Sequence, residues 1–215
     1  MSTLATRIRL GTLRAGFSLG GRLAPARTAE RAARLFATPF ASSRQRALAA
    51  HGDAAMRRGE LRVGSETIAT YVWGDPSTQP YALLAHGWSS FGLRYLPWVA
   101  RLREAGFAVV TFDQPGHGHS SGKLCTLPEF AATLHAVGAR YGTAALAVGH
   151  SLGGAAVALA QDEDWHAQRL ILVAPAADMK AAASRFFRFA RLGEHLREPF
   201  YDWLRSGEAV SVQTV

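Results

Sequence analysis

The segment that most constrains the fold is residues 146–156, which reads LAVGHSLGGAA. An apolar run typical of a buried strand breaks at Gly149, and small residues typical of a helix follow Ser151. Glycines stand two residues before and two residues after this serine. A strand that reverses into a helix within one residue holds that residue in a strained left-handed conformation, where flanking side chains would clash with the backbone. The pattern therefore predicts a strand–turn–helix elbow with Ser151 at its apex.

An elbow of this kind prepares a serine for chemistry. The hydroxyl of Ser151 would project above the edge of the sheet, and the backbone N–H of Leu152 would point the same way at the positive end of the new helix. Short motifs also occur by coincidence, so a small-residue turn without chemistry is the alternative. The rest of the chain decides between the two interpretations.

Composition indicates a folded chain with its charge concentrated at one end. The 215 residues are 48% hydrophobic, enough for one domain or for one domain with an appendage. The net charge is +8; residues 1–60 hold 11 arginines against three acidic residues, whereas residues 61–215 hold 13 basic and 13 acidic residues. The basic segment lacks the aromatic or glycine pattern of a recognised nucleic-acid-binding module, so we expect no nucleic-acid partner.

Residues 1–24 mix apolar residues with four arginines and contain no acidic residue. A secretory signal peptide is disfavoured because arginines interrupt every candidate apolar core. An organellar transit peptide or a membrane-surface helix fits the composition. We favour a helical extension packed on the domain, or a loosely ordered arm. Two helices are expected after it, over 28–36 with Thr28 as N-cap and over 43–50.

Strands begin at Leu61 and alternate with helices from Tyr81 onward. The expected strands are 61–64, 67–73, 81–85, 107–112, 144–149 and 169–174, and the expected helices are 92–105, 127–141 and 151–161. The first two strands would form a hairpin that turns at Ser65-Glu66. Strands that alternate with helices of this length predict a parallel sheet covered on both faces, with its ligand crevice at the carboxyl ends of the strands.

Three loops fall at those carboxyl ends. His86-Gly87-Trp88 follows the strand 81–85, the turn-rich segment 113–120 follows the strand 107–112, and the Ser151 elbow follows the strand 144–149. These motifs, in this order and on these elements, resemble the α/β-hydrolase superfamily in its single-domain bacterial, esterase-like form. The resemblance covers about residues 61–175.

The resemblance implies an α/β-hydrolase fold and a serine hydrolase acting on an ester or related acyl bond of a small molecule. Ser151 would be the nucleophile, and the backbone N–H groups of Trp88 and Leu152 would form the oxyanion hole, with Gly87 letting the main chain approach. No metal and no cofactor are implied. Four histidines are expected to transfer no proton and to serve in hydrogen-bonded loops or beside the acting backbone: His86, His117, His119 and His150.

The segment after Pro175 departs from the family pattern. Residues 176–215 resemble part of a helical lid with a tail, after a basic helical extension over 1–60 and a core over 61–175. The family order is serine, acid, histidine, yet His195 is the last histidine, and only Asp178 precedes it as a candidate acid. We therefore expect the last two strands to be missing and the strand 169–174 to be an exposed edge. A catalytically inactive fragment or binding module remains the alternative to an enzyme.

Localisation is inferred from absent signals. No apolar run approaches the roughly 18 residues that span a bilayer, and the single cysteine, Cys125, excludes an internal disulfide. We expect a cytoplasmic protein, with membrane-surface contact through residues 1–60 as the less favoured alternative.

Overall fold

The computed structural model describes residues 4–161 and 165–206, which fall into two compact units. Residues 4–37 and 178–206 form what we call the helical unit, and residues 38–161 and 165–177 form the sheet unit. The domain boundaries expected from the sequence, after residues 60 and 175, stay a prediction; the contacts divide the described chain after residues 37 and 177.

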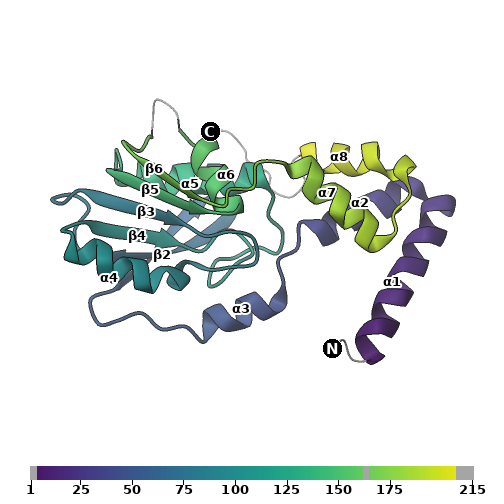
Figure 1. Ribbon diagram of the computed structural model, residues 1–215, viewed down its shortest axis with the longest axis horizontal. Helices are drawn as coiled ribbons and strands as arrows, with labels where there is room; N and C mark the ends of the chain where they lie inside the picture. Colours follow the sequence, from purple (N-terminus) through teal and green to yellow (C-terminus); the bar gives the residue numbers. More distant parts are fainter. Residues whose placement is uncertain (1–3, 162–164, 207–215) are drawn as a thin grey trace. The chain divides into compact units, whose positions relative to one another are not determined.

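The sheet unit is built on a six-stranded, mostly parallel sheet (Figure 1). Its strands are β1 (Arg57–Val63), β2 (Glu66–Trp73), β3 (Tyr81–Ala85), β4 (Ala108–Phe112), β5 (Leu146–His150) and β6 (Leu170–Val173). The spatial order is β1-β2-β4-β3-β5-β6; β2 runs antiparallel to both neighbours, and the remaining pairs are parallel. This confirms the α/β fold class predicted from the alternation of strands and helices.

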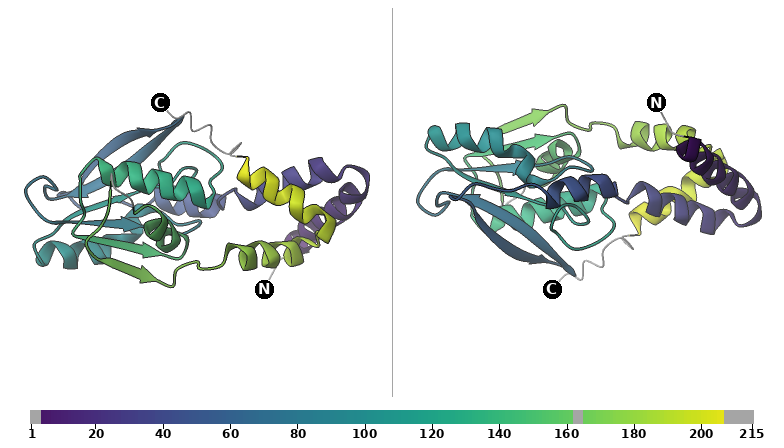
Figure 2. Two further views of the ribbon diagram at one scale, coloured as in Figure 1. Left: turned by 90° about the horizontal axis from the view of Figure 1, so that it is seen from above. Right: turned by 90° about the horizontal axis from the view of Figure 1, so that it is seen from below.

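Helices cover both faces of this sheet (Figure 2). They are α4 (Leu96–Glu104), which follows a 3₁₀ turn η1 (Gly92–Tyr95), α5 (Leu127–Ala139) and α6 (Leu152–Leu159). The helix α3 (Ala41–Leu48) lies instead beside a loop, where Arg44 donates to the carbonyl of Ser120 at 2.8 Å. Successive side chains of a strand point to opposite faces. Leu84 of β3 shares a buried cluster with Val99 of α4, whereas the Tyr81 hydroxyl bonds to the carbonyl of Gly138 in α5. Both layers are thus anchored on the fully buried β3.

The β1–β2 hairpin turns one residue earlier than the sequence suggested. Val63 pairs with Glu66, which leaves Gly64 and Ser65 as a two-residue loop. Gly64 has a φ of 55°, a conformation that glycine adopts at little cost. The expected turn at Ser65-Glu66 is therefore wrong by one position, because the glycine is part of the loop rather than the end of the strand.

β6 forms one edge of the sheet among the described strands. It pairs with β5 alone, and its four side chains, Leu170 to Val173, are each between 36% and 41% exposed. An apolar run that is exposed along a sheet edge agrees with the expectation that this strand is unpaired on one side.

The helical unit combines both ends of the chain. Its elements are α1 (Leu4–Leu23), α2 (Pro25–Phe36), α7 (Met179–Ala190), the 3₁₀ turn η2 (Glu194–Leu196) and α8 (Arg197–Arg205). The ring centroid of Phe200 lies 5.5 Å from that of Phe36 and 5.1 Å from that of Phe187. The N-terminal helices and the helices after Pro175 therefore share one aromatic core. No helix in the described ranges is long and apolar enough to cross a membrane.

The start of α2 corrects one expectation. The helix begins at Pro25, and the hydroxyl of Thr28 lies inside its first turn, donating to the carbonyl of Ala24 at 2.9 Å. Thr28 is thus not the N-cap. Proline is well suited to the first helical position because its fixed φ matches the helix and its missing N–H has no partner there.

A buried hydrogen-bonded group ties α5 to the sheet. The indole N–H of Trp165 donates to the Tyr81 hydroxyl at 3.1 Å, and that hydroxyl donates to the carbonyl of Gly142 at 2.6 Å. Trp165 is only 1% exposed and packs against Gly138, where a Cβ atom would overlap the indole ring. Close packing here depends on a glycine within a helix.

We predict that Gly138→Ala destabilises the sheet unit. Although alanine favours a helix by about 1 kcal/mol over glycine, the added methyl group would overpack Trp165 and cost about 1–3 kcal/mol. Urea denaturation followed by tryptophan fluorescence measures the change. The matched control is Gly16→Ala in α1, where nothing lies within 4 Å of the new Cβ and stability should not fall. A Gly138→Ala variant at least as stable as the parent would contradict this packing.

Candidate active site

Ser151 sits on the tight turn that joins β5 to α6. Its φ of 52° and ψ of −121° are rare for a residue with a side chain. A Cβ at Gly149 would lie 2.5 Å from the carbonyl oxygen of Gly153, and a Cβ at Gly153 would overlap the carbonyl oxygen of Ala85 in β3. The elbow predicted from the Gly-X-Ser-X-Gly spacing is thus present, for the steric reason expected.

Backbone hydrogen bonds fix the turn against β6. The N–H of Ser151 donates to the carbonyl of Val173 at 3.0 Å, and the carbonyl of Ser151 accepts from the N–H of Ala176 at 3.0 Å. Among the described residues, the N–H of Leu152 finds no acceptor. It stands at the first position of α6, where the helix dipole concentrates positive potential. The turn therefore presents a free donor directly beside the serine.

The loop after β3 lies against this serine. A Cβ at Gly87 would be 2.9 Å from the Cβ of Ser151 and 2.9 Å from the carbonyl oxygen of His150, so only glycine fits without displacement. The N–H of Trp88, which follows directly, has no acceptor among the residues that the structure describes. The structure thus places Gly87, the residue before Trp88, against Ser151, the residue before Leu152. An N–H group without a protein acceptor can donate to an oxygen atom that gains negative charge.

Two buried histidines hold this loop in place. The Nδ1–H of His86 donates to the carbonyl of Gly87 at 2.8 Å, and its Nε2 accepts from the N–H of Gln114 at 3.0 Å. The Nε2 of His117 accepts from the N–H of Ser89 at 3.1 Å, and its Nδ1 faces the carbonyl of Pro115 at 2.8 Å. Each ring uses one nitrogen as donor and the other as acceptor, which requires the neutral imidazole.

Burial keeps both of these rings uncharged. It lowers the pKa of His86 to about 4. Burial, reinforced by repulsion from His86, lowers the pKa of His117 to about 3. Neither ring is therefore suited to accept a proton near neutral pH. We expected no proton transfer from either histidine. That both rings hydrogen-bond the backbone of the loop was not predicted, although each histidine stands next to a glycine, Gly87 or Gly116, in a turn-rich segment.

Asp113 organises the segment 113–120 from inside. Its carboxylate accepts the Tyr71 hydroxyl at 2.7 Å and the N–H groups of Gly92 at 2.7 Å and His119 at 2.8 Å. Carboxylates that accept several such bonds are strong local anchors. The segment is thus built as a structural loop, and His119 is bound within it through the Tyr71 hydroxyl at 3.1 Å.

A base for Ser151 is not found among the described residues. No described side chain hydrogen-bonds the Ser151 hydroxyl. The carboxylate of Asp178 caps α7 by accepting the N–H of Ala181 at 2.9 Å, and Nε2 of His195 lies 2.9 Å from the carbonyl of Gly21. These two candidates for acid and base each make a structural contact inside the helical unit. Within the described ranges no group of three His, Cys, Asp or Glu side chains is placed to hold a metal ion.

We predict that the sheet unit loses stability as the pH falls from 7 to 5. An unfolded histidine takes up a proton near pH 6.5, whereas folded His86 and His117 do so only near their pKa values of about 4 and about 3. Across this window the unfolded chain binds more protons, so protonation favours unfolding. The expected loss at pH 5 is about 2 kcal/mol for each histidine, measurable by urea denaturation.

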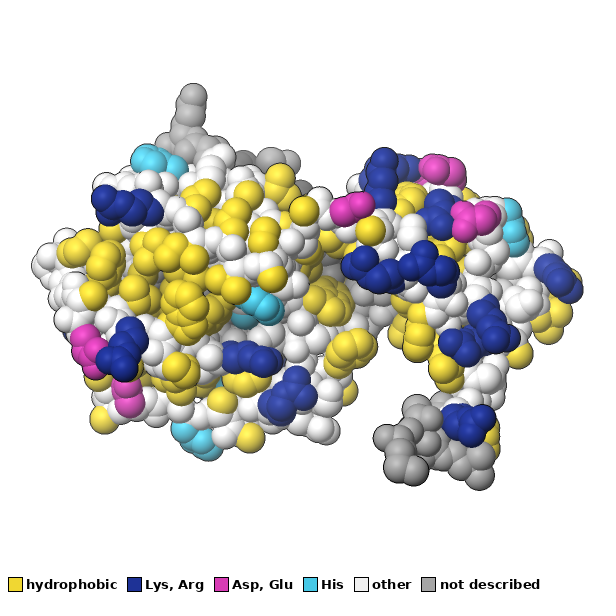
Figure 3. Space-filling model, in the orientation of Figure 1, with side chains coloured by type: hydrophobic (Ala, Val, Ile, Leu, Met, Phe, Trp, Pro, Cys, Tyr) yellow, Lys and Arg dark blue, Asp and Glu magenta, His cyan; other side chains and the backbone are white. Residues whose placement is uncertain are grey.

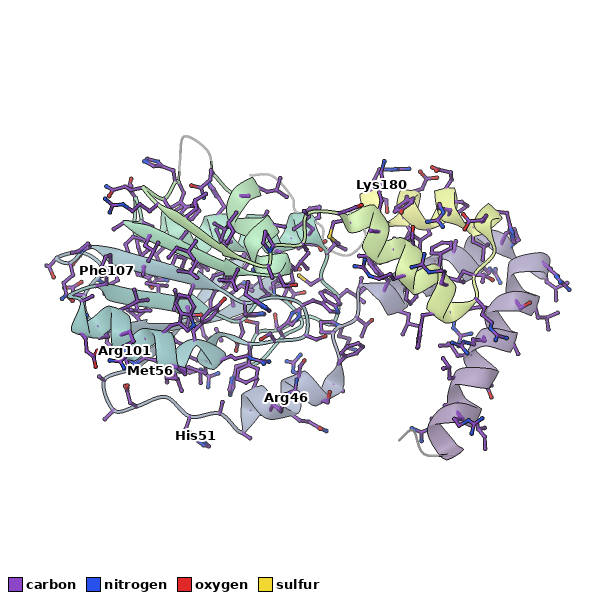
Figure 4. The ribbon with its side chains drawn as sticks, in the orientation of Figure 1. Arg46, His51, Met56, Arg101, Phe107 and Lys180 are labelled. Carbon is purple, nitrogen blue, oxygen red and sulfur yellow. The ribbon has the colours of Figure 1, made fainter. Side chains whose placement is uncertain are left out.

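Variants separate this effect from general acid sensitivity. His117→Gln should be less stable than the parent at pH 7, but the difference should shrink by about 2 kcal/mol at pH 5 because one titrating group is gone. The control is His51→Gln, a change at an exposed side chain on the loop after α3 (Figure 4). If the free energy of unfolding depended on pH in the same way for the parent and for His117→Gln, the fold would not be holding His117 neutral.

Comparison with known proteins agrees with this geometry. Residues 77–212 match the family model described as serine aminopeptidase, S33. A putative hydrolase from Agrobacterium vitis S4 superposes with a TM-score of 0.52 at 21% identity, covering 68% of this chain and 61% of that one. Alpha/beta hydrolase domain-containing protein 10 from mouse superposes with a TM-score of 0.50 at 22% identity, covering 70% of this chain and 59% of that one. A search of curated proteins found no match.

The structural likenesses establish the fold, and the chain spans less than two thirds of the length of either relative. The family model extends over more than half of the chain, including β3, β4, β5 and the elbow. The chain therefore belongs to the serine aminopeptidase S33 family of the α/β-hydrolase superfamily.

Proposed function

We propose that this protein is a serine hydrolase that cleaves an ester or related acyl bond of a small molecule through an acyl-enzyme on Ser151. The observation that carries the proposal is the elbow itself. Ser151 is held at a positive φ, the N–H of Leu152 has no described acceptor, and the loop that contains Gly87 packs against the serine. Strain of this kind persists where a fold has a use for it.

In the proposed reaction, the Ser151 oxygen attacks the acyl carbon, and its proton passes to a general base that the described residues do not supply. The substrate carbonyl oxygen becomes an oxyanion and accepts hydrogen bonds from the N–H groups of Leu152 and Trp88. Each such donor contributes about 3–4 kcal/mol to the transition state. Collapse of the intermediate expels the leaving group and leaves an acyl ester on Ser151, which water then hydrolyses by the same path.

A catalytically inactive member that only binds acyl compounds is the alternative. It is favoured by one observation: no described side chain hydrogen-bonds the Ser151 hydroxyl, and Asp178 and His195 are engaged within the helical unit. Without a base, the nucleophile would retain only the contribution of binding and oxyanion donors, about 10³–10⁴-fold over water. A cytoplasmic location stays a prediction under either proposal.

Ser151→Ala should abolish hydrolysis of short p-nitrophenyl esters and labelling by a fluorophosphonate probe, because the atom that becomes acylated is gone. We expect kcat/KM to fall at least about a thousandfold, and mass spectrometry of the labelled parent to place the probe on Ser151. Ser65→Ala, an exposed serine in the β1–β2 loop, is the control and should react normally. A parent protein that neither turns over nor takes the label would favour the inactive alternative.

Gly87→Ala tests the oxyanion hole. The methyl group would stand 2.9 Å from the Cβ of Ser151 and from the carbonyl oxygen of His150, so the loop must shift and carry the N–H of Trp88 with it. We expect kcat to fall by about 10²–10³ with little change in KM, since the donor acts mainly in the transition state. Circular dichroism checks the fold. An unchanged kcat in a folded variant would contradict the proposal that the N–H of Trp88 is an oxyanion donor.

A further inference from the structure

Positive charge is concentrated on the helical unit. Its 63 described residues carry 13 basic and five acidic side chains, a difference of +8, whereas the 137 described residues of the sheet unit carry 11 and seven, a difference of +4. In the space-filling view, Lys and Arg side chains gather over the helices of this unit (Figure 3). The helical unit is smaller and carries more net positive charge per residue, so it attracts a negatively charged partner more strongly than the sheet unit does.

α1 is apolar on two opposite faces. Its inner face packs Phe17, which is 3% exposed. On its outer face, Ile8, Leu19 and Leu23 are 59%, 60% and 76% exposed. Together with Ala15 they occupy positions 8, 15, 19 and 23, which fall on one side of a helix. This set, which we call the outer stripe, is apolar surface that the fold of the unit does not use.

Unneutralised arginines flank the outer stripe. Arg7, Arg9 and Arg22 are exposed on α1, and the helix contains no acidic residue. None of them pairs with a carboxylate among the described residues. Arg14, by contrast, is used for packing: its Nε donates to the carbonyl of Phe189 in α7 at 2.8 Å. Long basic side chains beside exposed apolar ones suit an interface where hydrocarbon meets charge.

A hollow of about 350 Å³ opens beside the stripe, between α1 and α2. Ile8, Leu13 and Phe17 give it an apolar wall, and Arg9 and Arg31 line it as well. An apolar groove with two guanidinium groups matches a molecule that combines an alkyl chain with a phosphate or carboxylate. The hollow and the outer stripe therefore both combine apolar side chains with arginines.

We propose that the outer face of α1 binds the surface of an anionic phospholipid membrane. The helix would lie in the interfacial plane, with the outer stripe at the acyl boundary and Arg7, Arg9 and Arg22 on lipid phosphates. A second copy of the unit would bring like charges together, and a nucleic acid would leave the apolar stripe without a partner. This surface does not depend on the proposed reaction at Ser151.

Sedimentation of the full chain with vesicles tests the proposal. We expect binding to phosphatidylcholine vesicles that contain phosphatidylserine, weakened by salt, and little binding to phosphatidylcholine alone. Arg7→Gln/Arg9→Gln should weaken binding about 25-fold, about fivefold for each arginine near the surface. Ile8→Ser/Leu19→Ser should weaken it at least about tenfold, through lost apolar burial. Both pairs of side chains are exposed, so circular dichroism should show an unchanged fold.

Arg46→Gln/Arg58→Gln is the matched control. It removes the same charge from exposed positions of the sheet unit, with Arg46 on α3 visible in Figure 4, and binding should stay within about twofold. The proposal would be overturned if the parent bound neutral vesicles as tightly as anionic ones. It would also be overturned if the control lost as much affinity as Arg7→Gln/Arg9→Gln, or if Ile8→Ser/Leu19→Ser bound as tightly as the parent. Binding to duplex DNA as tight as that to anionic vesicles, and unchanged by Ile8→Ser/Leu19→Ser, would overturn it as well.

Discussion

The left-handed backbone of Ser151 is the constraint on which the sheet unit depends. A non-glycine residue in such a conformation costs about 1–3 kcal/mol, and its neighbours must hold it there. β3 pairs with β5 up to Ala85 and Gly149, and the glycine at 153 lets α6 start directly against the end of β3. The turn thus exists because two parallel strands and one helix meet at a point where no side chain fits.

The loop beside Ser151 is held by groups that work only when uncharged. His86 links the backbone at 87 to that at 114, and His117 links the backbone at 89 to that at 115. Buried polar groups of this kind stabilise a structure only when every donor and acceptor is satisfied. The N–H groups of Leu152 and Trp88 have no acceptor among the described residues, so they can donate to a bound oxygen atom without breaking a hydrogen bond of the fold.

Local signals predicted much of this fold. The strand 81–85 has the predicted bounds because an apolar run ends abruptly at Pro80 and His86, and the elbow follows from two glycines around a serine. The sequence pattern predicts a start at Thr28, whereas α2 begins at Pro25, because proline is suited to the first helical position. The shared core of Phe36 and Phe200 was not predicted. Periodicity shows which face of a helix is apolar, but it does not show which distant helix covers that face.

The same limit applies to charge, whose excess of +8 lies in residues 1–60 when it is counted along the sequence. Residues 38–60 carry four of those arginines into the sheet unit, and residues 178–206 bring a net +2 to the helical unit. The charge thus follows the fold rather than the order of the sequence. The contacts of the elbow and those of the outer stripe are each internal to one unit. Substitutions at sites without shared partners act additively, so chemistry at Ser151 and binding through α1 can be altered separately.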